Sequence, residues 1–203
     1  MENPFTCRVR IQDPDMFWGR KAEIRTIMTR LSTMQNTSIV GERRIGKSSL
    51  LYYLYTKGNE LLNDESCRFV YLTMEDAANR RLPKFLNQIL KVIELPEISK
   101  EAELLDALDE FADKIKDLKG MKLVVLLDEF DKFSDLRKEY PPEFFDQMRS
   151  LLQGGNLAMV PASKKRLQAF SYANKISPFF NIFNRTDIKE FTEEEKIPFS
   201  PIC

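Results

Sequence analysis

The sequence predicts a three-layer α/β/α sandwich built around a mainly parallel sheet of five strands. Two observations support this fold class. Short, almost wholly apolar runs alternate along the chain with segments whose apolar residues recur at helical spacing. Strands that alternate with helices form parallel sheets covered on both faces, and their buried central strands have continuous apolar runs.

The expected elements follow one another without an internal repeat. Helical spacing indicates five helices, over 20–34, 47–57, 81–93, 101–119 and 142–152. Gly58 is expected to end the second helix. Apolar runs indicate strands at 37–40, 69–72, 123–127 and 157–160, and a fifth strand within 182–191. The fourth strand is expected to end at Pro161-Ala162-Ser163. We expect an irregular segment over 1–18, one domain over 19–195 and a tail over 196–203.

Composition narrows the classes of function. The chain has 203 residues, 43% hydrophobic and 31% charged, which is typical of a globular domain. Its 31 basic and 31 acidic side chains cancel, so no net field attracts nucleic acid or an anionic membrane. Without histidine, Ser-His-Asp catalysis, Cys-His catalysis and imidazole zinc sites are excluded. The three cysteines lack metal-ligand spacing, and neither a signal peptide nor a transmembrane run is evident, so we expect a cytoplasmic protein.

A glycine-bearing loop carries the strongest chemical signal. Residues 41–49 match G-x-x-x-x-G-K-[ST] without a mismatch, directly after an expected buried strand and at the start of an expected helix. Glycines let successive N–H groups point into one concavity, and the positive end of the helix dipole completes an anion site. We therefore expect ATP, or a related nucleoside triphosphate, with Lys47 on the β- and γ-phosphates and Ser48 on Mg²⁺. The loop residues are Gly41, Glu42, Arg43, Arg44, Ile45, Gly46, Lys47, Ser48 and Ser49.

A second element is expected to place carboxylates beside this loop. The five apolar residues 123–127 lead into Asp128 and Glu129, so Asp128 stands at the carboxyl end of a buried strand. One carboxylate there can hold Mg²⁺, directly or through water. Glu129 is predicted to polarise the attacking water, whereas Asp131 is interpreted as a helix-start charge. The two motifs together predict a hydrolytic nucleotide site.

With these residues assembled, the chain resembles the AAA+-like P-loop ATPases of the STAND and origin-recognition-like group, over roughly residues 15–195. Residues 126–131 match the Walker B segment of that group, and the run 17–23 is similar to its Phe-x-Gly-Arg-x-x-Glu box. The resemblance implies an AAA+-like P-loop NTPase fold in which this box, with Gly19 and Arg20, lies against the adenine. It also implies that Ser163, after the fourth strand, is the sensor 1 residue of the catalytic site.

The end of the sequence departs from the pattern of this group. Its members usually continue beyond a segment like 190–195 into a helical lid, and often into a winged-helix or repeat domain. Residues 196–203 form a proline-bearing tail that does not read as the start of a lid helix. We therefore expect no lid here, and slow rather than fast turnover. A protein partner or self-association stays open.

Several functions fit these motifs. The leading hypothesis is an ATPase switch, in which ATP and Mg²⁺ order the site and slow hydrolysis resets it. The alternatives are a nucleotide-dependent DNA-binding protein of origin-recognition type, a non-hydrolysing scaffold with bound nucleotide, and a small-molecule kinase. The neutral net charge weighs against DNA, and an Asp-Glu strand end fits hydrolysis better than transfer to an acceptor. GTP is not expected, because residues 174–177 lack the aspartate of an Asn-Lys-x-Asp base reader.

Overall fold

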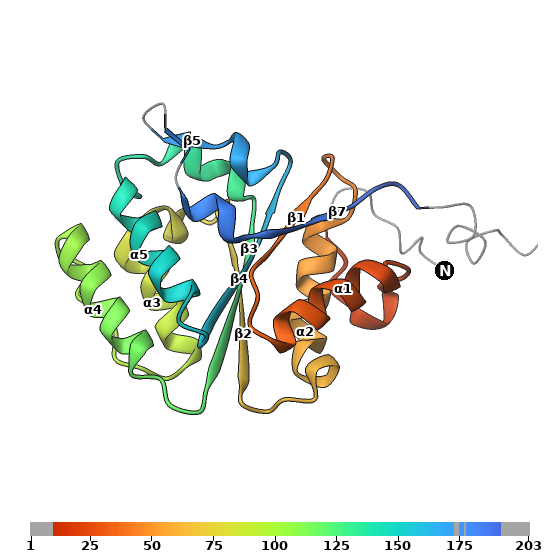
Figure 1. The fold of residues 1–203 in the computed structure, drawn as a ribbon, viewed down its shortest axis with the longest axis horizontal. Helices are drawn as coiled ribbons and strands as arrows, with labels where there is room; N and C mark the ends of the chain where they lie inside the picture. The colour runs from red at the N-terminus through yellow and green to blue at the C-terminus, as the bar shows by residue number, and fades with distance from the viewer. Residues whose placement is uncertain (1–9, 173–174, 177, 192–203) are drawn as a thin grey trace, which may run out of the picture.

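The computed structural model describes residues 10–172, 175–176 and 178–191 of the chain (Figure 1). Its main sheet has five strands, all paired in parallel, in the order β2-β3-β4-β1-β7. The strands are β1 (Thr37–Val40), β2 (Cys67–Thr73), β3 (Lys122–Asp128), β4 (Leu157–Ser163) and β7 (Asn184–Asp187). Two short strands, β5 (Ser171–Tyr172) and β6 (Lys175–Ile176), form a separate antiparallel pair. The expected α/β fold with a five-stranded parallel sheet is confirmed.

Helices cover both faces of this sheet, which gives the three expected layers (Figure 1). One face carries α1 (Lys21–Ser32) and α2 (Lys47–Leu62), and the other carries α3 (Leu82–Val92), α4 (Leu104–Lys116) and α5 (Pro142–Leu152). Short 3-10 helices join these elements: η1 (Pro14–Met16), η2 (Ala77–Arg80), η3 (Phe130–Asp135), η4 (Leu167–Ala169) and η5 (Pro178–Ile182). Among the described residues, no helix combines the length and hydrophobicity needed to cross a bilayer.

The two faces of the sheet have separate apolar cores. On β3, Val124 and Leu126 pack with α1 and α2, whereas Val125 and Leu127 pack with α3, α4 and α5. Successive side chains of a strand point to opposite faces, so a residue two positions beyond Leu126 returns to the α2 face. Asp128 is that residue, and β3 therefore directs its carboxyl group toward the side of the sheet where α2 begins.

One predicted element end is wrong. The helix α2 continues through Gly58 to Leu62, and Asn63 ends it in a left-handed conformation with φ 50°. Gly58 instead lets α2 approach β2, because a Cβ atom there would lie 2.5 Å from Cζ of Phe69. The strand β4 ends at Ser163, within the stretch 161–163 where its end is expected, and its pairing with β3 at Pro161 and with β1 at Ser163 continues the ladder to that point. The other predicted helices end within a few residues of the observed ones.

The segment before α1 is packed onto α2. The backbone N–H of Ile11 donates to Oγ of Ser49 at 3.0 Å, and the ring of Phe17 stacks on Tyr53 with centroids 4.6 Å apart. The described part of the expected irregular segment thus contains η1 and contacts the domain that follows. The remainder of that segment, residues 1–9, and the expected tail 196–203 lie outside the described residues.

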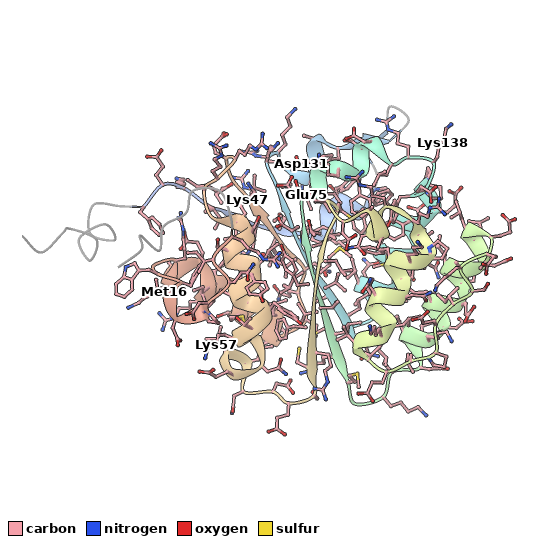
Figure 2. All side chains as sticks on the ribbon, turned by 180° about the vertical axis from the view of Figure 1, so that it is seen from behind. Met16, Lys47, Lys57, Glu75, Asp131 and Lys138 are labelled. Carbon is pink, nitrogen blue, oxygen red and sulfur yellow. The ribbon has the colours of Figure 1, made fainter. Side chains whose placement is uncertain are left out.

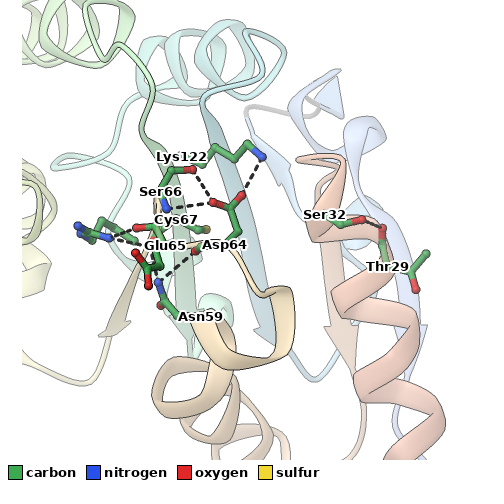
Figure 3. A network of polar contacts seen from close by, with 9 residues as sticks. Thr29, Ser32, Asn59, Asp64, Glu65, Ser66, Cys67 and Lys122 are labelled. Carbon is green, nitrogen blue, oxygen red and sulfur yellow. Dashed lines mark hydrogen bonds and ion pairs between the residues drawn. The ribbon is translucent and has the colours of Figure 1, made fainter.

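A polar network ties the turn after α2 to the start of β3 (Figure 3). Asp64 accepts hydrogen bonds from the hydroxyl group of Ser66 at 2.6 Å and from its backbone N–H at 2.9 Å, and Nζ of Lys122 donates at 3.0 Å. Hydrogen bonds from Ser66 and then Lys122 lower the pKa of the Asp64 carboxyl to about 2. This network lies at the amino ends of β2 and β3, so it supports the sheet at the end opposite the predicted nucleotide site.

Candidate functional site

The loop 41–49 runs from the end of β1 into the first turn of α2, as the motif predicts. Gly46 begins the helix with φ 102°, a left-handed conformation that glycine adopts without a steric penalty. Gly41 is required for a different reason, because a Cβ atom there would lie 2.8 Å from the carbonyl oxygen of Ile188. The first N–H groups of an α-helix have no acceptor within the helix. The loop therefore presents amide donors at the positive end of α2, as an anion site requires.

Lys47 is folded back onto its own loop. Its Nζ donates to the carbonyl oxygens of Gly41 and Glu42, both at 2.8 Å, and the residue is 9% exposed. Burial lowers the pKa of the Lys47 ammonium, and the nearby carboxylates of Glu129 and Asp128 oppose that shift. The lysine thus lies between the loop carbonyls and the acidic end of β3, where a cation reduces the repulsion between the carboxylates and a polyphosphate.

Asp128 lies at the carboxyl end of β3 and is 4% exposed. Its Oδ1 accepts the backbone N–H of Glu129 at 2.9 Å, and its Oδ2 accepts the hydroxyl group of Tyr71 at 2.8 Å. Asp128 and Ser48, which carries a hydroxyl group, line one cavity, which is described below. An oxygen-only donor set with few protein ligands is the chemistry that Mg²⁺ prefers, so these residues fit the ion that the motif implies.

Glu129 leaves the strand through an unusual backbone conformation. Its φ of 53° and ψ of 43° are left-handed, which costs a residue with a Cβ atom about 1–2 kcal/mol. Burial raises the pKa of its carboxyl, and the neighbouring charges of Asp128 and Glu75 raise it further. A carboxylate with a raised proton affinity beside a phosphate site can polarise a water molecule.

Two other predicted site residues have mainly structural contacts. Ser163 is fully buried, and its hydroxyl group donates to the carbonyl oxygen of Lys165 at 2.6 Å. It does not line the cavity described below, and its sensor role stays a prediction. Asp131 accepts the backbone N–H of Lys164 at 2.9 Å, so it holds η3 against the end of β4 rather than acting only as a helix-start charge.

The Gly-Arg pair connects the phosphate loop to the segment after β7. Gly19 has φ 75°, and a Cβ atom there would lie 2.6 Å from the ring of Phe191. The Arg20 guanidinium donates from Nη1 to the carbonyl oxygen of Lys189 at 2.6 Å and from Nη2 to that of Ile45 at 3.1 Å. Its Cζ lies 4.1 Å from the centroid of the Phe191 ring. Contact of this pair with adenine stays a prediction, and its structural contacts anchor the loop.

One cavity of about 1010 Å³ brings most of the predicted residues together. Figure 2 shows Lys47, Glu75 and Asp131 at the same end of the sheet. The predicted residues that line the cavity are Arg20, Arg43, Arg44, Ile45, Gly46, Lys47, Ser48, Ser49, Asp128 and Glu129. Gly19, Gly41, Glu42 and Ser163 are not part of its lining.

Sequence reasoning missed part of this lining. Beyond the predicted set, the cavity is lined by Arg10, Ile11, Gln12, Phe17, Trp18, Tyr71, Thr73, Glu75 and Phe191. Phe17 and Trp18 belong to the run that suggested the Gly-Arg box. Tyr71 and Thr73 could have been suspected, because the carboxyl ends of parallel strands share one edge of the sheet. That inference requires β2 to be the neighbour of β3, and no local pattern specifies this.

The family of the chain follows from a comparison with family models. The model described as novel STAND NTPase 2 matches residues 30–197. The chain belongs to this family. This match confirms the expected membership of the STAND NTPases, and the fold is the expected AAA+-like P-loop fold, which structures of origin-recognition proteins share. A comparison with curated proteins gives no match.

Solved structures share the fold of this STAND NTPase at low sequence identity. The ORC1 protein of Aeropyrum pernix in complex with DNA has a TM-score of 0.71 at 10% identity, covering 95% of this chain and 50% of that one. The Drosophila ORC bound to DNA has a TM-score of 0.68 at 14% identity, covering 91% and 46%. The ADP form of the Aeropyrum pernix ORC2 protein has a TM-score of 0.64 at 18% identity, covering 98% and 53%. The chain therefore spans about half the length of these neighbours.

Proposed function

We propose that this STAND NTPase binds ATP with Mg²⁺ in the cavity beside α2, hydrolyses ATP slowly, and acts as a nucleotide switch. One observation carries the proposal: a single cavity is lined by the phosphate loop, by Asp128 and by Glu129. Phosphoryl transfer to water requires positioning and charge stabilisation more than covalent catalysis. These three features supply a phosphate site, an ion site and a water-polarising carboxylate.

Each residue has a separate task in this mechanism. The amides at the start of α2 bind the phosphate oxygens, and Lys47 exchanges the carbonyls of Gly41 and Glu42 for the β- and γ-phosphates. Ser48 and Asp128 hold Mg²⁺, which neutralises charge on the phosphates when it is bound. Glu129 accepts a hydrogen bond from the attacking water and orients it toward the γ-phosphorus atom.

Aromatic side chains line the cavity where the base of the nucleotide can bind. Phe17, Trp18 and Phe191 line the cavity next to Arg20, and Trp18 is 47% exposed. Aromatic rings bind flat heterocycles by stacking. The Phe-x-Gly-Arg-x-x-Glu run and the missing guanine reader favour adenine as that base.

The test uses two site variants and a matched control for each. Lys47→Ala should abolish ATP binding in calorimetry, whereas Lys57→Ala, at a partly exposed position of the same helix, should bind as the wild type does. Glu129→Gln should bind ATP but release no phosphate, and Glu143→Gln on the surface of α5 should retain wild-type turnover. Normal ATP binding by Lys47→Ala would show that the site is assigned wrongly.

The remaining candidates predict different results for the wild type. If the protein is a non-hydrolysing scaffold, ATP should raise its melting temperature strongly, but the protein should release no phosphate. Nucleotide-dependent DNA binding is favoured by similar structures that contain DNA, and it should weaken steeply with salt. Specific ATPase activity that rises with protein concentration would indicate self-association and residues acting between subunits.

A further inference from the structure

We propose that Arg10 orients Tyr71 and that Tyr71 in turn orients the carboxylate of Asp128; we call these two residues the positioning relay. They therefore belong to the part of the nucleotide site that binds Mg²⁺. The inference rests on the proposed function, because it concerns the carboxylate to which that function assigns Mg²⁺. Neither residue belongs to the phosphate loop, to the Asp-Glu strand end or to the Gly-Arg box. Both line the cavity.

Tyr71 reaches Asp128 from the neighbouring strand. Thr73 pairs with Asp128 in the parallel register of β2 and β3, and Tyr71 is two residues earlier on the same face of β2. Its long side chain spans this offset, and its hydroxyl group donates to Oδ2 of Asp128 at 2.8 Å. The hydroxyl group of Tyr71 therefore acts as a hydrogen-bond donor to this carboxylate.

Arg10 in turn orients the phenol. Its Nη1 donates to the Tyr71 oxygen at 3.1 Å, and its Cζ lies 4.5 Å from the ring centroid of Tyr52 and 4.8 Å from that of Tyr71. The guanidinium is thus held against two rings by cation–π attraction. A hydroxyl group that accepts a hydrogen bond from a cation is polarised and becomes a stronger donor. The adjoining N–H of Ile11 is fixed on Ser49, which holds this stretch of backbone against the start of α2.

These contacts fix the orientation of the Asp128 carboxylate and leave it able to bind a metal ion. One hydrogen bond reaches each oxygen, from Glu129 N–H on Oδ1 and from Tyr71 on Oδ2. An ionised carboxylate has about four lone-pair sites, so about two remain for an ion or its water ligands. Partners that hold a metal ligand in its binding orientation affect metal affinity or activity by about 10- to 100-fold. The relay is therefore expected to act on ion-dependent binding and not on the phosphate loop itself.

Tyr71→Phe tests the relay with little change in packing, because it keeps the ring beside Arg10 and removes only the hydroxyl group. The measurement is the ATP dissociation constant by calorimetry, once with excess Mg²⁺ and once with EDTA. The factor by which Mg²⁺ tightens ATP binding should fall about 10-fold or more in Tyr71→Phe, while the constant in EDTA stays that of the wild type. Arg10→Gln should lower this factor to a smaller extent. Tyr55→Phe is the matched control, because Tyr55 belongs to the same ring cluster but does not line the cavity.

The outcomes separate this inference from the proposed function. Suppose that the wild-type protein binds ATP more tightly with Mg²⁺ than with EDTA. If Mg²⁺ then tightens ATP binding by Tyr71→Phe by the same factor, the relay is overturned and the proposed function is not. Equal weakening with Mg²⁺ and with EDTA also overturns it, since that result indicates general damage to the site. A wild type whose ATP binding does not respond to Mg²⁺ overturns both proposals. If Tyr71→Phe does not fold, the Mg²⁺ factor of Arg10→Gln decides by the same criteria.

Discussion

Arg20→Ala distinguishes an anchor of the phosphate loop from a direct nucleotide contact. The Arg20 side chain is 5% exposed and donates to the carbonyl oxygens of Ile45 in the loop and Lys189 after β7, as well as to Glu23. Removing the guanidinium should loosen the loop from the segment after β7, because it bridges the two. The nucleotide-free protein should therefore be destabilised, and the loop should bind phosphate less well.

The magnitude follows from the hydrogen bonds that the guanidinium makes. Hydrogen bonds from a charged group contribute about 1.5–3 kcal/mol each, and Arg20 makes two to backbone carbonyls. Because Arg20 lines the cavity, water can replace part of this bonding, so we expect a net destabilisation of about 2–4 kcal/mol. The left-handed φ of 59° is as strained for alanine as for arginine and cancels in the difference. In a protein of this size the destabilisation corresponds to a decrease of about 4–16 °C in melting temperature.

The assay is thermal unfolding without nucleotide, followed by calorimetric titration with ATP. Arg25→Ala on an exposed position of α1 is the control and should melt as the wild type does. An anchor predicts that Arg20→Ala loses stability first, and that its affinity for ATP falls as a consequence. If Arg20→Ala instead melts like the wild type but binds ATP weakly, Arg20 contacts the nucleotide directly and the anchoring argument is wrong.

Two further predictions concern the framework of the sheet. Gly58→Ala should gain about 1 kcal/mol of helix propensity but lose about 1–3 kcal/mol by overpacking against Phe69, for a net change of zero to about 2 kcal/mol destabilising in urea unfolding. Adding Phe69→Leu to Gly58→Ala should relieve the overpacking. If Gly58→Ala alone is more stable than the wild type, the close approach of α2 to Phe69 is contradicted. The stabilising effect of Asp64 should be complete above its ordinary pKa of 3.8 and disappear as pH falls toward about 2, because its folded-state pKa is lowered. Asp64→Asn should therefore melt below the wild type at pH 7, with a gap that narrows between about pH 4 and pH 2; a gap independent of pH would refute the linkage.

The phosphate loop and the acidic strand end could be predicted because their signals are contiguous. A glycine turn between a buried strand and a helix, and an apolar run that enters Asp128, each specify local geometry. The end of α2 shows where such reasoning fails. Gly58 reads as a stop signal in isolation, yet packing against Phe69 makes it an interior residue of the helix.

Arg20 shows the same limit inside the site. Its place in the Gly-Arg box is evident from the run 17–23, but its bonds to Ile45 and Lys189 are not. Lys189 lies 169 positions away along the chain, and the contact exists only because β7 pairs with β1. Local propensity contains no information about such a pairing.

By itself, the sequence determined the fold class, the phosphate loop and the placement of Asp128 at a strand end, because hydrophobic periodicity and turn chemistry act over neighbouring residues. The tertiary structure alone decided which side chains surround that carboxylate. Arg10 and Tyr71 are 61 positions apart, and they meet beside Asp128 because β2 pairs with β3 in register while Arg10 and Ile11 contact α2. Strand order and register are set by the burial of both sheet faces together, a cooperative property of the folded chain.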